Sequence, residues 1–100
     1  MVDVAREGSV VRITMNRAAK RNALSAEHLT ELLEAFREAG SSDATGIVLA
    51  AEGPVFSAGH DFGDVHARDE EGVRLLLELC TVLMKTIQSV PQVVIARVHG

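Results

Sequence analysis

A short apolar run that leads directly into a glycine-punctuated loop constrains this chain more than any other feature. Residues 46–51 (GIVLAA) predict a buried strand, and residues 53–64 follow it with one proline and three glycines. Glycine permits backbone conformations closed to other residues, and proline fixes φ. Because backbone amides can approach a ligand closely in such loops, α/β proteins often bind ligands where a strand ends. The pattern therefore predicts an α/β fold with a ligand-binding loop at residues 53–64.

Three well-known loop motifs fail on spacing. A phosphate-binding loop has four residues between its glycines and then Gly-Lys-Ser/Thr, whereas five residues separate Gly53 from Gly59 and His60 follows. A dinucleotide-binding fingerprint needs Gly-x-Gly-x-x-Gly, but the loop glycines are six and four positions apart. A nucleophile elbow needs Gly-x-Ser-x-Gly, and Val55 stands two residues before Ser57. The loop therefore matches none of these three classes.

Residues 56–61 (FSAGHD) closely resemble the loop after the second core strand in the crotonase superfamily, the enoyl-CoA hydratase/isomerase family. The resemblance extends to residues 13–17 (ITMNR) and 20–25 (KRNALS), and downstream to residues 91–100. It implies an α/β fold with a crotonase-like ββα superhelical core, of which the chain forms the N-terminal half only. Residues 1–100 are then expected to be the N-terminal part of a crotonase-like acyl-CoA-binding domain that is incomplete at its C-terminal end.

The resemblance also implies which residues contact a substrate. The backbone N–H of His60 is expected to be one of two oxyanion-hole donors that hold the thioester carbonyl of an acyl-coenzyme A, and the second donor is expected beyond Gly100. Coenzyme A enters only as part of the substrate, and neither a separate cofactor nor a metal is expected. The residues expected to bind the substrate are Arg21, Ala23, Leu24, Ala58, Gly59, His60, Asp61 and Phe62.

Three basic residues lie within five positions upstream of that loop, namely Arg17, Lys20 and Arg21. One interpretation is a solvated surface loop, which is the common role of such clusters. The other is a docking point for phosphates, because Arg and Lys pair with phosphates through charge-assisted hydrogen bonds. The resemblance favours the second interpretation, since the matching loop lines the coenzyme A site. The sequence departs from the family pattern at Ala18 and Val93, where a proline is frequent.

The loop side chains allow other interpretations. Ser57, His60 and Asp61 could form a hydrolytic triad, but three neighbours in one loop rarely converge as nucleophile, base and orienter. His60 and His66 could bind a metal, but no carboxylate or cysteine pattern completes a closed site. We expect the His60 side chain to shape the pocket and Asp61 to cap the helical turn that follows.

Composition argues against several classes of partner. The net charge of −4 comes without a basic run, so neither nucleic acid nor an anionic membrane is an expected partner. Charged residues interrupt the longest apolar-rich segment, so no transmembrane span is expected. The N-terminus lacks the basic and apolar regions of a secretory signal. A single cysteine, Cys80, cannot form an internal disulfide and suits the cytoplasm, which is the expected location.

Local patterns predict the remaining elements. Residues 2–6 and 10–15 alternate around a glycine-serine turn and predict a hairpin. A helix is expected from the N-cap Ser25 to Gly40, with His28 on its surface.

A second helix is expected to begin at the acidic residues 69–71 and to end just before the second proline. It is apolar around most of its circumference, so we expect burial on more than one side, with Cys80 and Met84 in the core. Residues 93–98 predict another buried strand. Because a domain rarely ends two residues after a core strand, the chain is expected to continue beyond Gly100.

The resemblance implies an enoyl-CoA hydratase (lyase) or isomerase of fatty acid or related acyl-CoA metabolism. Two N–H donors at the thioester oxygen stabilise the enolate that forms when the α-carbon loses a proton or the β-carbon is attacked. Three alternatives stay open: a non-catalytic acyl-CoA-binding protein, an acyl-CoA thioester hydrolase of the same fold, and a structural α/β domain with a coincidental motif. The resemblance implies a homotrimer, or a hexamer of two trimers, for the full-length protein. Residues 1–100 alone are expected to be inactive and to aggregate or to behave as a loosely packed state.

Overall fold

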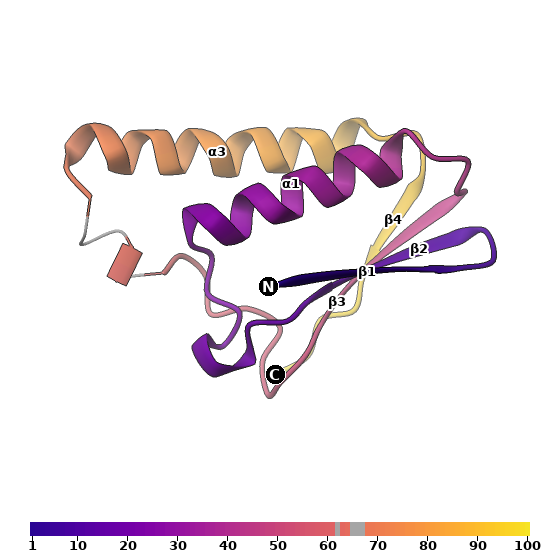
Figure 1. Ribbon diagram of the computed structural model, residues 1–100, viewed down its shortest axis with the longest axis horizontal. Helices are drawn as coiled ribbons and strands as arrows, with labels where there is room; N and C mark the ends of the chain where they lie inside the picture. Colours follow the sequence, from indigo (N-terminus) through magenta and orange to yellow (C-terminus); the bar gives the residue numbers. More distant parts are fainter. Residues whose placement is uncertain (62, 65–67) are drawn as a thin grey trace.

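The computed structural model describes residues 1–61, 63–64 and 68–100 (Figure 1). Within them the chain forms four strands, two long helices and one short 3-10 helix. In chain order these are β1 (Val2–Glu7), β2 (Val10–Met15), η1 (Ala18–Lys20), α1 (Ala26–Gly40), β3 (Gly46–Ala51), α3 (Glu70–Ser89) and β4 (Val93–Ala96). The predicted α/β fold class is confirmed.

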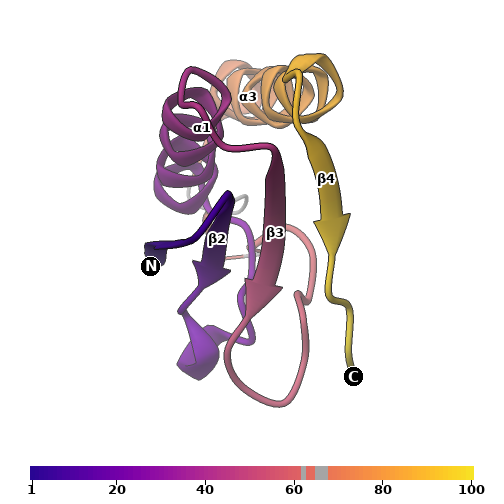
Figure 2. The same cartoon turned by 90° about the vertical axis from the view of Figure 1, so that its right-hand side faces the viewer.

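The four strands form one sheet in the order β1-β2-β3-β4. β1 and β2 are antiparallel and pair from Val2 with Met15 to Glu7 with Val10, so the predicted hairpin is confirmed. β2, β3 and β4 are parallel, and their carboxyl ends point to the same edge of the sheet (Figure 2). The segments that follow β2, β3 and β4 therefore all leave the sheet at one edge.

The core lies between the sheet and the helices. Side chains alternate along β2, so Val11, Ile13 and Met15 are buried while Arg12 and Thr14 occupy the opposite face. The buried residues of β2 pack in one cluster with Leu29, Leu32, Leu33 and Phe36 of α1 and with Ile47 of β3. Truncation of a fully buried phenylalanine such as Phe36 to alanine typically costs about 3–5 kcal/mol.

α1 has the ends that the sequence predicts. The Ser25 side chain accepts a hydrogen bond from the His28 N–H at 3.1 Å, which satisfies one of the unpaired amides of the first turn. Glu27 lies in the first turn and Arg37 in the last, and both charges complement the helix dipole. The helix ends at Gly40, as expected.

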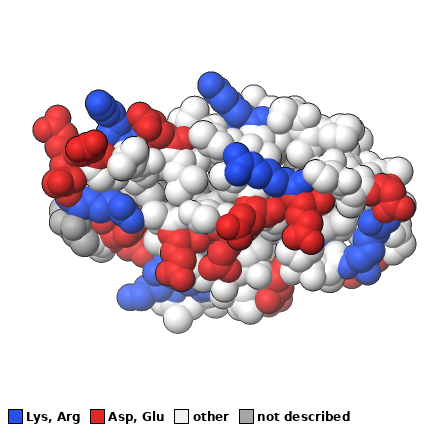
Figure 3. Space-filling view, turned by 45° about the horizontal axis from the view of Figure 1, so that its top comes forward, with Lys and Arg blue, Asp and Glu red and all other residues white. Residues whose placement is uncertain are grey.

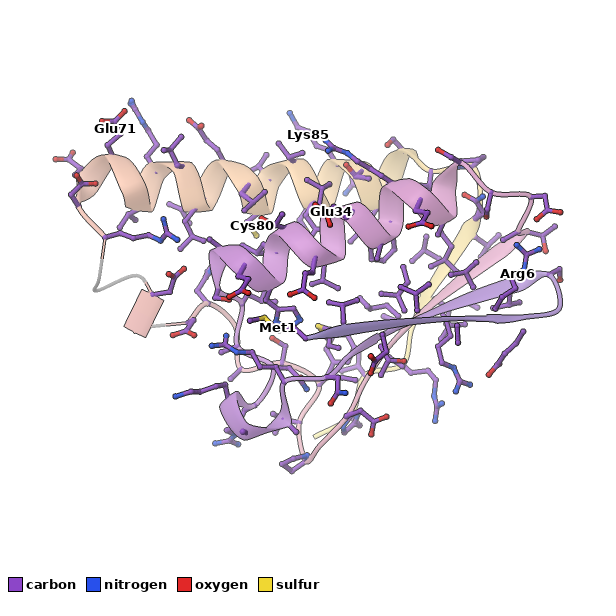
Figure 4. The ribbon with its side chains drawn as sticks, viewed as in Figure 1. Met1, Arg6, Glu34, Glu71, Cys80 and Lys85 are labelled. Atoms are coloured by element: carbon purple, nitrogen blue, oxygen red, sulfur yellow. The ribbon has the colours of Figure 1, made fainter. Side chains whose placement is uncertain are left out.

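α3 begins as predicted, with the Asp69 side chain accepting from the Gly72 N–H at 2.8 Å. Among the described residues α3 is covered on one side, where Leu76 and Leu83 are fully buried, and the expected cover of its other sides is not part of this chain. Cys80 is partly buried and packs on the core, and Figure 4 shows it on the side of α3 that faces α1, opposite Lys85. Met84, which was expected in the core, is 44% exposed in this chain.

β4 forms where a strand was expected, but it is shorter than predicted and is not buried. Val93 and Ile95 are exposed, and so is Val98 beyond the end of the strand. β4 lies at the edge of the sheet, and these residues have no covering layer among the described residues. The apolar pattern that predicted burial therefore marks an exposed apolar surface here.

The charged residues are dispersed over the helical side of the molecule. Figure 3 shows acidic and basic side chains interspersed there, with uncharged surface between them. Neither helix in the described part of the chain combines the length and apolarity that crossing a membrane requires.

Candidate functional site

The candidate site lies where the three parallel strands end. Residues 16–24 follow β2, residues 52–61 follow β3, and residues 97–100 follow β4, so all three segments meet at the carboxyl edge of the sheet (Figure 2). Ligands of open parallel sheets bind in this position. The predicted ligand-binding loop therefore lies at the edge of the sheet where ligands of such folds bind.

A tight turn at Arg21 and Asn22 brings the first two segments together. Both residues have φ of 53°, in the left-handed region that residues other than glycine seldom adopt. The Arg21 carbonyl accepts from the Ala58 N–H at 2.9 Å, and the Asn22 carbonyl accepts from the Ser57 hydroxyl at 2.9 Å. The turn thus presents two successive carbonyls to the glycine-containing loop.

The Asn22 side chain holds that loop from beneath. It is fully buried, and its Nδ2 donates to the carbonyls of Glu52 at 2.8 Å and Val55 at 3.1 Å. Its Oδ1 accepts from the Arg17 N–H at 2.8 Å. Because one amide side chain satisfies three backbone groups from two segments, it fixes their relative positions.

Leu24 and His60 form an isolated parallel bridge beyond the turn. The Leu24 N–H donates to the Gly59 carbonyl at 2.6 Å, and the Asp61 N–H donates to the Leu24 carbonyl at 3.1 Å. A trans peptide points its C=O and N–H in opposite directions. Since the Gly59 C=O points at Leu24, the His60 N–H in the same peptide group points away from it. Gly59 has φ of 84°, which allows the chain to take this course.

The His60 N–H is not used by the described part of the fold. Among the described residues, it donates no hydrogen bond to a protein group. His60 is half-buried, and a backbone donor held in a fixed direction without a described protein acceptor can donate to a ligand. The His60 ring Nδ1 is buried and also has no protein partner in the described part of the chain.

Two ion pairs fasten the loop to its surroundings. Arg17 Nη1 lies 3.0 Å from Asp61 Oδ2, and Arg68 Nη2 lies 3.2 Å from Asp64 Oδ1. Asp61 Oδ1 also accepts from the Asp64 N–H at 3.1 Å, which confirms the predicted capping contact. This amide first, and then Arg17, hold the pKa of the Asp61 carboxyl below its usual value.

Asp64 joins the loop to α1. Its Oδ2 accepts from the Ala26 N–H at 3.0 Å, at the first residue of the helix. That hydrogen bond first, and the neighbouring Arg68 second, lower the pKa of the Asp64 carboxyl. Both loop carboxylates are therefore ionised at neutral pH and are weak bases, and each is already paired with a guanidinium.

The expected surface position of His28 is wrong. The side chain is fully buried, and its Nδ1 lies 3.2 Å from the Ala23 carbonyl oxygen. A carbonyl only accepts, so Nδ1 carries the proton. Burial lowers the pKa of His28, and the imidazole is therefore neutral at pH 7. No sequence pattern indicates this burial, because a single polar residue in the first turn of a helix is usually exposed.

The structure brings together most of the predicted substrate residues. Arg21, Ala23, Leu24, Ala58, Gly59, His60 and Asp61 lie in the two segments that the turn and the bridge join. Phe62, the eighth, and His66 of the metal hypothesis lie outside the described residues. Asn22 was not singled out as a contributor, although an asparagine that tolerates positive φ beside a glycine-containing loop is a usable signal.

The basic cluster divides in two. Arg17 turns inward to Asp61 and is 19% exposed, whereas Lys20 and Arg21 are exposed. Only the latter two are thus placed to meet a phosphate from solvent.

An apolar cavity of about 100 Å³ lies between the loop and the helices. Its lining comes from the loop (Phe56, Ser57), from Leu24, from β2 and β3 (Met15, Leu49), from α1 (Leu32, Phe36) and from α3 (Leu83, Met84, Ile87). In the described part of the chain, no group of three His, Cys, Asp or Glu side chains is arranged to hold a metal ion.

Fold and site together define an α/β protein with a backbone amide presented at the carboxyl edge of a parallel sheet. The sequence profile of the enoyl-CoA hydratase/isomerase family matches residues 5–100. The chain belongs to this family, and the predicted crotonase resemblance is confirmed.

Individual relatives agree with the profile. The mitochondrial enoyl-CoA hydratase domain-containing protein 3 of Danio rerio is 38% identical over 96 residues, covering 94% of this chain and 33% of the relative. The crystal structure of an enoyl-CoA hydratase from Mycobacterium smegmatis is 40% identical, with a TM-score of 0.95 over 99% of this chain and 40% of that one. That of human enoyl-CoA hydratase domain-containing protein 3 is 32% identical, with a TM-score of 0.87 and coverages of 99% and 40%. The chain therefore spans only about a third to two fifths of the length of these relatives.

Proposed function

We propose that the protein containing this chain binds an acyl-CoA thioester at the carboxyl edge of the sheet and acts as an enoyl-CoA hydratase or isomerase. The observation that carries this proposal is the His60 N–H, which two hydrogen bonds of the Leu24 bridge orient and which no described protein group accepts. Family membership supports it. The thioester oxygen takes the free position in front of this amide.

The chemistry follows from the charge that develops on that oxygen. Loss of an α-proton, or attack of water on the β-carbon of an enoyl thioester, moves an electron pair onto the carbonyl oxygen. A donor already held in place stabilises this enolate without having to reorganise. One such donor typically contributes about 2.7–4 kcal/mol to the lowering of the barrier. The His60 amide supplies one donor, and a second is required from elsewhere in the protein.

The neighbouring groups fit the remaining parts of the substrate. The apolar cavity lined by Leu24 and Phe56 accommodates hydrocarbon of the acyl group, and the exposed Arg21 and Lys20 pair with coenzyme A phosphates. Asp61 and Asp64 are engaged with arginines, which makes them structural groups rather than proton carriers. The acid and base of the reaction are therefore assigned to other residues of the protein.

A non-catalytic acyl-CoA-binding protein is the second candidate. The pairing of both loop carboxylates favours it, because the described site then offers an oxyanion donor without an adjacent free acid. Turnover separates the two candidates: hydration of crotonyl-CoA supports the enzyme, and binding without turnover of any enoyl-CoA supports the binder.

Assembly and location belong to the same proposal. The exposed apolar residues of α3 and β4 support a homotrimer or a hexamer of two trimers. We place the protein in the cytoplasm, on the single cysteine and the charge pattern. Cell fractionation tests this location, since the Danio rerio relative carries the word mitochondrial in its name.

Two substitutions at one position test the donor. His60→Ala and His60→Pro both remove the imidazole, but only proline removes the N–H. We expect His60→Ala to keep kcat for crotonyl-CoA within about threefold and His60→Pro to lose about 10²- to 10³-fold. Equal losses in both variants would assign the role to the imidazole, and full activity in both would remove the amide from the mechanism.

Gly59→Val supplies an independent check in case the proline variant folds poorly. An added Cβ at Gly59 meets no atom within 4 Å, so the substitution acts through φ of 84° rather than through a clash. We expect a folded protein, by thermal unfolding, that has lost activity because the His60 N–H is redirected. An active Gly59→Val enzyme would contradict the role of this amide.

A further inference from the structure

The peptide group that carries the His60 N–H is the last in a row of hydrogen-bonded groups. The Gly59 C=O of that group accepts from the Leu24 N–H at 2.6 Å. The Leu24 N–H belongs to the same peptide group as the Ala23 C=O, which accepts from Arg17 Nη1 at 3.0 Å. The row therefore runs from the Arg17 guanidinium through two peptide groups to the His60 N–H.

We infer that Arg17 is a positioning residue that orients and polarises the His60 N–H through the Ala23–Leu24 and Gly59–His60 peptide groups. The inference rests on the proposed function, because it assigns a purpose to the same amide. A charge-assisted hydrogen bond is roughly twice as strong as a neutral one, and hydrogen bonds in a row strengthen one another by about 10–30% each. A cation at the far end of this row makes the terminal N–H a better donor to an oxyanion.

A second set of contacts keeps Arg17 at the head of the row. The Asn22 side chain accepts from the Arg17 N–H, and Asp61 Oδ2 lies 3.0 Å from Nη1. Nη1 carries two hydrogens, one for the Ala23 carbonyl and one for Asp61. The neutral His28 also donates to the Ala23 carbonyl, and holds that peptide plane from the side of α1.

The Asp61 carboxylate does not cancel the polarisation. Among the described residues its oxygens pair with Arg17 and the Asp64 N–H, and neither oxygen contacts a peptide group of the row. The Asp61 backbone N–H instead donates to the Leu24 carbonyl, so Asp61 also helps to hold Leu24 in place. The ion pair leaves the directional bond from Arg17 to Ala23 intact.

Two variants distinguish the loss of polarisation along the row from the effect of leaving the Asp61 carboxylate unpaired. Arg17→Met removes the guanidinium but leaves the Asp61 carboxylate unpaired. Arg17→Met with Asp61→Asn removes both charges and leaves the row without its cation. Arg12→Met is the matched control, because within the described residues the Arg12 side chain of β2 makes only a surface ion pair with Glu7 at 3.6 Å.

The readouts are chosen so that one needs no ligand. In protein labelled with ¹⁵N-leucine and ¹⁵N-histidine, we expect the Leu24 and His60 amide protons to move upfield in both Arg17 variants. With crotonyl-CoA, we expect kcat to fall about tenfold, less than the 10²–10³ for complete loss of a donor, while KM changes less than about twofold. The infrared thioester stretch of a bound acyl-CoA should shift back toward its value in solution. Arg17→Lys should restore part of each effect, and Arg12→Met should change none.

Several results would overturn the inference. Unmoved Leu24 and His60 amides in a folded Arg17→Met protein would show that the row is not polarised. Wild-type kcat in the double variant would show that the single variant failed through its unpaired carboxylate. A wild-type protein that binds no acyl-CoA would remove the proposed function, while the amide shifts of the ligand-free protein would still decide whether Arg17 polarises the His60 N–H.

Discussion

The His99 ring lies against the start of the glycine-containing loop, with Nε2 2.8 Å from the Gly53 carbonyl oxygen. The His99 carbonyl in turn accepts from the Phe56 N–H at 3.0 Å. At the next residue, a Cβ on Gly100 would approach the Pro54 carbonyl oxygen to 2.7 Å. The segment after β4 thus holds the loop from one side, while the turn at Asn22 holds it from the other. The loop is therefore held in place from two sides.

Loss of the Asn22 side chain is expected to loosen this arrangement. Asn22→Ala leaves the Glu52 and Val55 carbonyls and the Arg17 N–H without their partner, and it places alanine at a φ of 53°. We expect the free energy of unfolding to fall by about 2–3 kcal/mol, measured by urea denaturation. The control is Asn16→Ala, whose exposed side chain donates only to Asp3 and should cost less than about 1 kcal/mol. Equal costs for the two variants would contradict the central place given to Asn22.

The structure confirms the elements that repeated sequence patterns predict. It differs from the predictions for residues whose position depends on a single contact with a distant part of the chain. The hairpin, both helices and the glycine-containing loop follow from periodicity, caps and turn residues, which are local. The inward turn of Arg17 depends on Asp61, a partner far along the chain, and a cluster of basic residues carries no sign of which member will be paired. His28 is buried for the same kind of reason, because its partner is a backbone carbonyl that only the folded turn provides.

The second departure concerns α3 and β4. Apolar residues on most sides of a helix predict burial, but they do not say what covers each side. In the structure α1 covers the side with Leu76 and Leu83, and the flanking apolar residues stay exposed. Sequence patterning thus identified the apolar surface correctly, and the cover that it predicts for the flanks is not found among the described residues.

Arg21 is expected to act on substrate binding rather than on chemistry. A phosphate contact far from the reacting carbon stabilises the bound substrate and the transition state alike. Arg21→Ala should therefore raise the Kd for a coenzyme A thioester about fivefold, lower the salt dependence of Kd, and leave kcat at saturation unchanged. Arg37→Ala, which removes an exposed arginine from the last turn of α1, is the matched control. An unchanged Kd and an unchanged salt dependence would instead support the interpretation of the basic loop as a solvated surface loop.

His28 should make stability depend on pH below its ordinary pKa of 6.5. Its folded-state pKa is lowered, so as the pH falls below 6.5 the unfolded chain takes up the proton first. The free energy of unfolding should then decrease, by at most about 1.4 kcal/mol per pH unit, until the pH reaches the folded-state pKa. Above 6.5 the contribution of His28 is constant. His28→Gln removes this titration, and the comparison of its urea-unfolding profile with the wild type between pH 5 and 8, roughly the range of histidine titration, isolates the effect. Parallel profiles would show that His28 titrates normally.

The exposed apolar residues predict self-association of the 100-residue chain. Leu75 and Val82 lie on one flank of α3 and Leu77 and Met84 on the other, each pair one heptad apart, and all four are exposed. Together with the exposed residues of β4 they form the kind of surface that associates.

Sedimentation velocity should therefore show species whose size grows with concentration. Leu77→Glu with Met84→Glu should shift them toward the monomer, because each glutamate places a charge on the associating flank. Lys85→Glu, on the polar side of α3, changes the net charge by the same two units as the double variant without altering that flank, and should not change the distribution. A monodisperse monomer at all concentrations, with one sharp thermal transition, would show that these apolar flanks need no cover.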